Sequence, residues 1–157
     1  MSTKTYQKAK KIILKNKDLA DFEGKKSAKL ITKAEAAVGL KFSGSYLDYL
    51  QTFGAGNFGS EEVYGIIDED FEDSSVPDAI WYTLNLRKSI NLPANFLAIY
   101  DTGSEEIFCL DFQSTDATGE PKVVALDLGY ALDDQTIEVI ADDFGDFLLE
   151  LVEEELE

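Results

Sequence analysis

Three short runs of branched and aromatic residues in the second half of the chain constrain the fold most. They cover residues 96–100, 107–112 and 122–128, and polar connections that contain Asp or Gly separate them. Runs of about four to eight such residues between turn-forming residues are typical of β-strands, and an Asp- and Gly-containing connection between two of them favours a hairpin. The sequence therefore predicts an antiparallel meander.

Segments with helical spacing lie on both sides of this meander. In the first of them Tyr6, Ala9 and Ile13 fall near one face and the lysines on the other, as in an amphipathic helix. A second pair of strands is expected over residues 58–67, with a turn at Gly59. The segments with helical spacing cover residues 4–17, 32–38, 46–53, 80–88 and 138–156.

Local signals predict where several of these helices begin and end. Thr32 and Glu35 match a capping box, which satisfies two free amides at a helix start. Gly39 is a plausible C-cap, and the serines before Pro77 are expected to open the central helix. Residues 18–30 contain polar residues and a glycine, so they are expected to form a connecting loop.

These elements predict a single α+β domain over residues 1–157. In it, an antiparallel sheet packs with N-terminal, central and C-terminal helices. The length of 157 residues fits one domain, since domain sizes peak at roughly 100–150 residues. Hydrophobic residues make up 45% of the chain, which is sufficient for a folded core despite the high charge.

The chain contains no histidine and one cysteine, Cys109. This composition excludes a Ser-His-Asp triad, a Cys-His dyad, an imidazole metal ligand and an internal disulfide. We therefore expect no catalytic residues, no metal site and no cofactor. Cys109 lies in an apolar run and is expected to be an inert buried thiol. Trp81 lies at helical spacing and is interpreted as a core residue rather than a binding anchor.

The chain is strongly acidic, with 14 Lys and Arg against 31 Asp and Glu and a formal net charge of −17. Direct binding to nucleic acid and to anionic membrane surfaces is disfavoured, because both require positive charge on the binding face. No apolar run approaches the roughly 18–20 residues of a membrane span. The apolar run at residues 12–14 is too short for a signal peptide, so we expect a cytoplasmic location.

The charge is unevenly distributed along the chain. Residues 1–50 carry eleven lysines and five acids, a net charge of +6, whereas residues 51–157 carry three bases and 26 acids, a net charge of −23. Two interpretations remain open. The acidic part is a solvated surface that keeps the protein soluble, or it is a face that steers a basic partner into contact.

Acidic residues in the expected loops are the candidates for partner contacts. A solvated loop is an equally good interpretation of residues 68–73, and a calcium loop is a poor one, because Asp73 stands where the glycine would be needed. Paired carboxylates also occur in glycosidases, but acids are so abundant here that pairs arise by chance. The candidates are Asp68, Glu69, Asp70, Glu72, Asp73, Asp101, Glu105, Glu106, Asp133 and Asp134.

Four segments, taken in order, resemble the SUKH superfamily of Smi/Knr-type domains, and the resemblance covers about residues 5–153. Each segment is weakly specific by itself, and the resemblance depends on the order and spacing of the four segments together. The segments are the Ala-Glu helix at 32–39 with Ser-Tyr-Leu-Asp-Tyr-Leu at 45–50, Phe-Gly-Ala-Gly-Asn-Phe at 53–58 with Val-Tyr-Gly-Ile at 63–66, Phe-Leu-Ala-Ile-Tyr-Asp at 96–101 with Cys-Leu-Asp at 109–111, and Phe-Gly-Asp-Phe-Leu at 144–148.

This resemblance implies an α+β domain that binds other proteins. In bacteria, most similar domains are immunity proteins that neutralise a polymorphic or contact-dependent toxin, often a nuclease. The expected partner is therefore a cognate toxin with a basic active-site cleft, which the acidic protein would occlude. The alternative is a regulatory scaffold of the Smi/Knr type without a toxin partner. The oligomeric state is left open.

Overall fold

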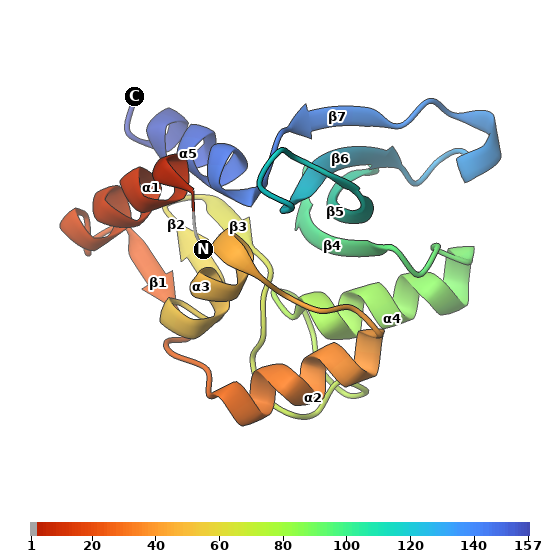
Figure 1. The fold of residues 1–157 in the computed structure, drawn as a ribbon, viewed down its shortest axis with the longest axis horizontal. Coiled ribbons are helices and arrows are strands. Elements are labelled where there is room, and N and C mark those ends of the chain that lie inside the picture. Colours follow the sequence, from red (N-terminus) through yellow and green to blue (C-terminus); the bar gives the residue numbers. More distant parts are fainter. Residues whose placement is uncertain (1–2) are drawn as a thin grey trace.

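The computed structural model describes residues 3–157, and these form one α+β domain with two antiparallel sheets (Figure 1). The smaller sheet contains β1 (Ala20–Phe22), β2 (Gly56–Phe58) and β3 (Glu61–Val63) in that order. The larger sheet contains β4 (Phe96–Asp101), β5 (Glu106–Thr115), β6 (Pro121–Asp127) and β7 (Glu138–Ala141), also in sequence order. The predicted fold class is confirmed.

Five α-helices pack with the two sheets: α1 (Lys4–Lys15), α2 (Ala28–Val38), α3 (Gly44–Thr52), α4 (Ala79–Ile90) and α5 (Phe144–Glu155). Figure 1 shows α1 lying beside α5, although the two helices stand at opposite ends of the chain. The helix α4 lies next to β4, and α2 lies beside α4. A short 3-10 helix, η1 (Leu132–Asp134), lies in the connection between β6 and β7.

The main core is formed by aromatic and branched side chains of α1, α3, α5 and both sheets. Tyr6, Ala9 and Ile13 are the buried face of α1, as the helical spacing predicts. Tyr46 and Tyr49 of α3 are also buried, and their hydroxyl groups donate to the carbonyl oxygens of the β3 region at 3.0 and 2.8 Å. These bonds satisfy the polar ends of two buried rings and attach α3 to the smaller sheet.

The second helix begins earlier than the capping-box pattern predicts. Ser27 is its N-cap, with its hydroxyl accepting from the amide of Leu30 at 3.1 Å. Thr32 lies inside the helix and donates to a backbone carbonyl one turn back. The predicted loop over 18–30 is wrong in part, since it contains β1 and the helix start. Gly39 ends the helix in the left-handed conformation, as predicted.

Two other predicted boundaries are wrong. The central helix is capped by Asp78, which accepts from two amides at 2.9 and 3.1 Å, and not by a serine before Pro77. Residues 138–141 form β7, paired with β6, instead of the start of the last helix. Val139 of this strand is 49% exposed. Asp143 caps α5 after the strand ends, because its side chain accepts from a first-turn amide.

The structure agrees with the prediction made for Cys109 and contradicts the one made for Trp81. Cys109 is fully buried in β5, and burial raises the pKa of its thiol well above the ordinary value, so the predicted inert thiol is consistent with the structure. Trp81 is only half-buried and belongs to neither core cluster, so its interpretation as a core residue is wrong. Its ring stacks on the neighbouring Tyr82 at a centroid distance of 6.4 Å.

Candidate partner-binding surface

The predicted acidic candidates fall into two separate groups. The first is the run at residues 68–73, in the connection between β3 and α4, and it lies beside α2. Glu69 is paired with Lys33 at 2.8 Å. Asp68 and Asp70 accept backbone amides of their own loop at 2.9–3.2 Å. These contacts shape the loop, and several of its carboxylates are therefore already bonded within the chain.

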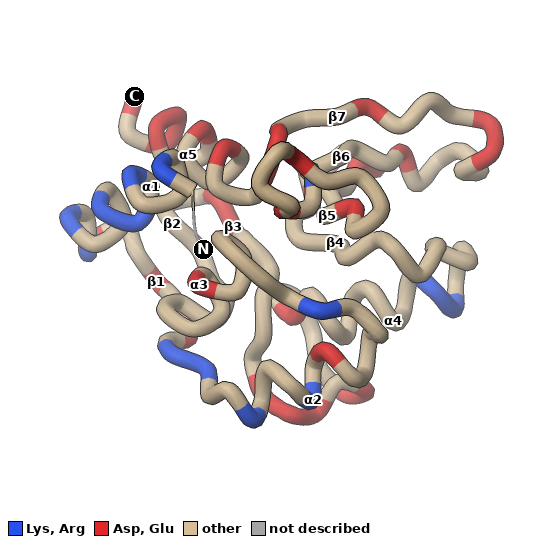
Figure 2. The backbone as a smooth tube through the Cα atoms, viewed as in Figure 1, with Lys and Arg blue, Asp and Glu red and all other residues tan. Residues whose placement is uncertain are grey.

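The second group surrounds one end of the larger sheet and contains Asp101, Glu105, Glu106, Asp133 and Asp134. The amide of Leu128 donates to the carbonyl of Glu105 at 2.7 Å, which holds the β4–β5 hairpin against the segment that follows β6. In Figure 2 the β6–β7 connection carries acidic residues at one edge of the molecule, whereas the segment between β3 and α4 lies on another side, near α2. The structure therefore does not bring all ten candidates onto one surface.

A third concentration of acids lies on α5, which the loop-based prediction missed. Residues 142–157 carry eight acids and no base. In Figure 2 they form a red stretch along α5, next to the lysines of α1. One ion pair connects the two helices, Lys8 with Glu153 at 3.7 Å. We call the outward-facing acids of α5 the acidic ridge: Asp146, Glu150, Glu153 and Glu154.

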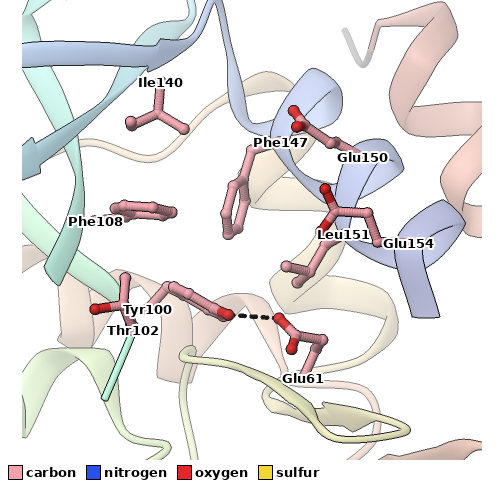
Figure 3. Close-up of a pocket in the computed structure, with 9 residues that line it drawn as sticks. All are labelled: Glu61, Tyr100, Thr102, Phe108, Ile140, Phe147, Glu150, Leu151 and Glu154. Carbon is pink, nitrogen blue, oxygen red and sulfur yellow. Dashed lines mark hydrogen bonds between the residues drawn. The ribbon is translucent and has the colours of Figure 1, made fainter. Parts of the chain in front are cut away.

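A pocket of about 310 Å³ lies between the acidic ridge and the larger sheet (Figure 3). Three aromatic rings contact one another in its wall. The ring centroids of Tyr100 and Phe108 are 5.3 Å apart, and Phe147 stands nearly perpendicular to both, at 5.5 and 5.9 Å. Ile140 and Leu151 complete the apolar lining. We call this cavity the aromatic pocket.

Each element contributes to the aromatic pocket through its own periodicity. Along α5, Phe147 and Leu151 are separated by one helical turn and lie on the same face. Tyr100 and Phe108 are partners in the β4–β5 pairing, which places their rings side by side. A register irregularity between Ala98 and Tyr100 precedes this pair, so the local pairing also determines which residue faces the pocket.

Three carboxylates stand at the edge of the aromatic pocket: Glu61, Glu150 and Glu154 (Figure 3). The hydroxyl group of Tyr100 donates to Glu61. Burial and this hydrogen bond raise the pKa of Tyr100 well above its ordinary value, so the phenol stays protonated and continues to donate. Within residues 3–157 the side chains of Glu150 and Glu154 have no hydrogen-bond or ion-pair partner.

A buried carboxyl group at the start of α5 has a structural role. Asp143 is 5% exposed, and its Oδ1 accepts from the amide of Asp146 at 2.9 Å. Burial, together with hydrogen bonding to Asp116, raises the pKa of Asp143 to about 7. The nearby Glu120 is 4% exposed and accepts from the amide of Ser45 at 3.1 Å, at the start of α3. These carboxyl groups connect the β5–β6 loop with the starts of two helices.

Among residues 3–157 no group of three or more Cys, Asp or Glu side chains is placed to hold a metal ion. None of the helices in the same range is long and apolar enough to cross a membrane.

The fold and this surface define an α+β domain with a hollowed acidic face. A model of the SUKH_6 family, described as SMI1-KNR4 cell-wall, matches residues 28–148. The chain therefore belongs to this family of the SUKH superfamily, which is associated with the binding of partner proteins. The comparison with curated proteins gave no match. The matched range contains the larger sheet, β2, β3 and Phe147, whereas β1, Glu150 and Glu154 lie outside it.

Proposed function

We propose that this protein is an immunity protein that binds and neutralises a cognate toxin, a nuclease with a basic active-site cleft. The observation that carries the proposal is the combination of family membership with a run of eight acids and no base over residues 142–157. A domain of a partner-binding family with unpaired carboxylates on one face is complementary to a basic protein surface.

The proposed mechanism is occlusion of the active site. A nuclease cleft binds phosphates through lysines and arginines, and carboxylates on a protein surface can occupy the same positions. The acidic ridge supplies a row of such carboxylates on a rigid helix. Nothing catalytic is required of this chain, because inhibition follows from exclusion of the substrate. Such an inhibitor would act in the cytoplasm, where we propose that the protein resides.

The acidic face is also expected to determine how fast the partners meet. Electrostatically steered pairs associate at up to about 10⁸–10⁹ M⁻¹s⁻¹ at low salt, against roughly 10⁵–10⁶ M⁻¹s⁻¹ without steering. Added salt screens this attraction over about 10 Å at 0.1 M. The association rate is therefore expected to fall steeply with salt, and the dissociation rate much less.

The direct test is to look for a toxin gene next to this one and to co-express the two proteins. The expected result is that the two proteins co-purify, that growth is restored and that the purified complex no longer cleaves nucleic acid. If the pair neither co-purifies nor relieves toxicity, the proposal fails. Recovery of several unrelated cellular proteins instead would favour the regulatory scaffold.

A charge-matched pair of variants locates the interface. Glu150→Gln with Glu154→Gln removes two charges from the acidic ridge, and Asp133→Asn with Asp134→Asn removes two from the β6–β7 connection. Stopped-flow association at increasing salt should show a loss of rate and of salt dependence for the first double variant and a smaller loss for the second. Equal effects would mean that net charge alone, and no particular face, attracts the partner.

A further inference from the structure

We propose that the aromatic pocket is the anchor site of the interface and that it receives one arginine side chain of the partner. This inference rests on the proposed function only in taking the partner to be basic. The pocket combines an apolar, aromatic interior with carboxylates at its edge, which is the combination that a long cationic side chain requires.

The interior of the pocket fits the planar head of a guanidinium group. Tyr100, Phe108 and Phe147 form mutually contacting rings, and the faces of such rings attract cations within about 6 Å of the centroid. Arginine stacks on aromatic faces more readily than lysine, because its charge is spread over a flat and weakly hydrated group. The volume of about 310 Å³ lies at the low end of ligand pockets, which suits one side chain rather than a nucleotide.

The edge of the pocket supplies the charge. The hydroxyl group of Tyr100 fixes Glu61 on one side. Glu150 and Glu154 stand on the other side, one helical turn apart, and neither is paired with any residue of the described chain. Two carboxylates at this spacing repel each other, so a cation between them relieves a cost that exists in the free protein. A guanidinium can also bond a carboxylate through two parallel N–H groups.

The other acidic groups lack this combination. In the run at 68–73 the carboxylate of Glu69 is paired with Lys33, and Asp70 accepts amides of its own loop. The hollow near the β6–β7 connection is lined mainly by acids and polar residues, and Tyr130 is its one aromatic side chain among the described residues. Buried aromatic contacts carry most of the energy of protein interfaces, so the aromatic pocket is the place for an anchor.

The test uses a small probe, so it does not require the toxin to be known. The probe N-acetyl-arginine-N-methylamide is titrated into the ¹⁵N-labelled protein, and amide shifts are followed by NMR. The control is the citrulline analogue, which has nearly the same shape and no charge. We expect millimolar binding of the arginine probe, with the largest shifts at Thr102, Phe108, Ile140 and Phe147, and no saturable shifts with citrulline.

The variants decide whether the pocket is responsible. Glu150→Gln with Glu154→Gln is expected to weaken probe binding about tenfold, whereas Asp133→Asn with Asp134→Asn leaves it unchanged. Equal binding of citrulline, shifts centred elsewhere, or equal weakening by both double variants would overturn the proposal. These outcomes do not depend on the toxin. If the pocket binds the arginine probe but the protein has no toxin partner, the proposed function is refuted and the arginine site is not.

Discussion

The substitution Asp143→Asn is predicted to make the protein more stable than the wild type at pH 8, and by a clearly smaller margin at pH 5. Asp143 is the buried N-cap of α5, and burial with hydrogen bonding to Asp116 raises its pKa to about 7. Glu120 and Asp146 lie close enough to raise this pKa further, and no ion pair of the described chain offsets them. Asparagine keeps the oxygen that accepts the amide and carries no charge, so it imitates the protonated carboxyl group.

The sign and size of this effect follow from proton linkage. An unfolded aspartate has a pKa of about 3.9, so between about pH 4 and pH 7 the folded protein holds a proton that the unfolded chain has released. The stability contributed by Asp143 therefore falls as the pH rises through this interval, by at most about 1.4 kcal/mol per pH unit, and stays constant above it. Between pH 5 and pH 7 the stability contributed by Asp143 can fall by at most about 3 kcal/mol. Screening by nearby water reduces the expected fall to about 1–2 kcal/mol.

Urea unfolding of the wild type and the variant at pH 5, 6, 7 and 8 measures this difference. The matched control is Asp142→Asn, which removes the same charge at the adjacent and exposed position. The reasoning is refuted if the advantage of Asp143→Asn does not change with pH, or if Asp142→Asn reproduces it. In the second case, relief of the overall negative charge would explain the effect.

Four further outcomes are expected. Asp78→Ala should cost about 2 kcal/mol in urea unfolding, because two amides at the start of α4 lose their acceptor, whereas Asp78→Asn keeps the acceptor and should cost much less. Cys109 should not react with Ellman's reagent at pH 8 until the protein unfolds, since the thiol is fully buried and burial raises its pKa. Gly145→Ala should lower stability by about 1–3 kcal/mol despite the better helix propensity of alanine, because its Cβ would lie 2.9 Å from Tyr6 Cβ. Glu154→Gln should raise the midpoint of thermal unfolding slightly, with a gain of about 0.3–0.5 kcal/mol, because it removes a negative charge from the last turn of α5.

The sequence predicts those parts of the fold that depend on near neighbours in the chain. The buried face of α1 follows from helical spacing alone, and the left-handed conformation at Gly39 follows from the absence of a side chain. The β4–β5 hairpin is predicted from its turn residues and from the strand-forming runs on either side. In each case the deciding interactions lie within a few residues.

The wrong predictions arise where two patterns fit the same residues. Thr32 with Glu35 matches a capping box, but Ser27 provides a cap five residues earlier and gives a longer helix. Val139 lies at helical spacing from the apolar residues of α5, yet β6 offers it an unpaired strand edge. Backbone pairing with β6 places residues 138–141 in a strand, and local spacing contains no information about that edge.

The aromatic pocket could not have been predicted from local patterns. Tyr100 and Phe108 meet because of the β4–β5 register, and Phe147 reaches them only because α5 packs against the sheet. Glu61 joins the pocket from the smaller sheet, through a hydrogen bond to a residue 39 positions away. The one available signal is the spacing of Glu150 and Glu154, a like-charged pair one turn apart without a base in the last turn.

The acids at the end of α5 destabilise the helix in which they lie. A helix has partial negative charge at its C-terminal end, where lysine stabilises and glutamate destabilises, and α5 ends with three consecutive glutamates. The helix forms nevertheless because its opposite face buries Phe144, Leu148 and Val152 in the main core. Residues that reduce local stability without a benefit to packing are expected at functional sites. Binding of a cationic partner would remove this repulsion, so complex formation should raise the unfolding temperature of this domain and should protect the amides at the end of α5 from exchange.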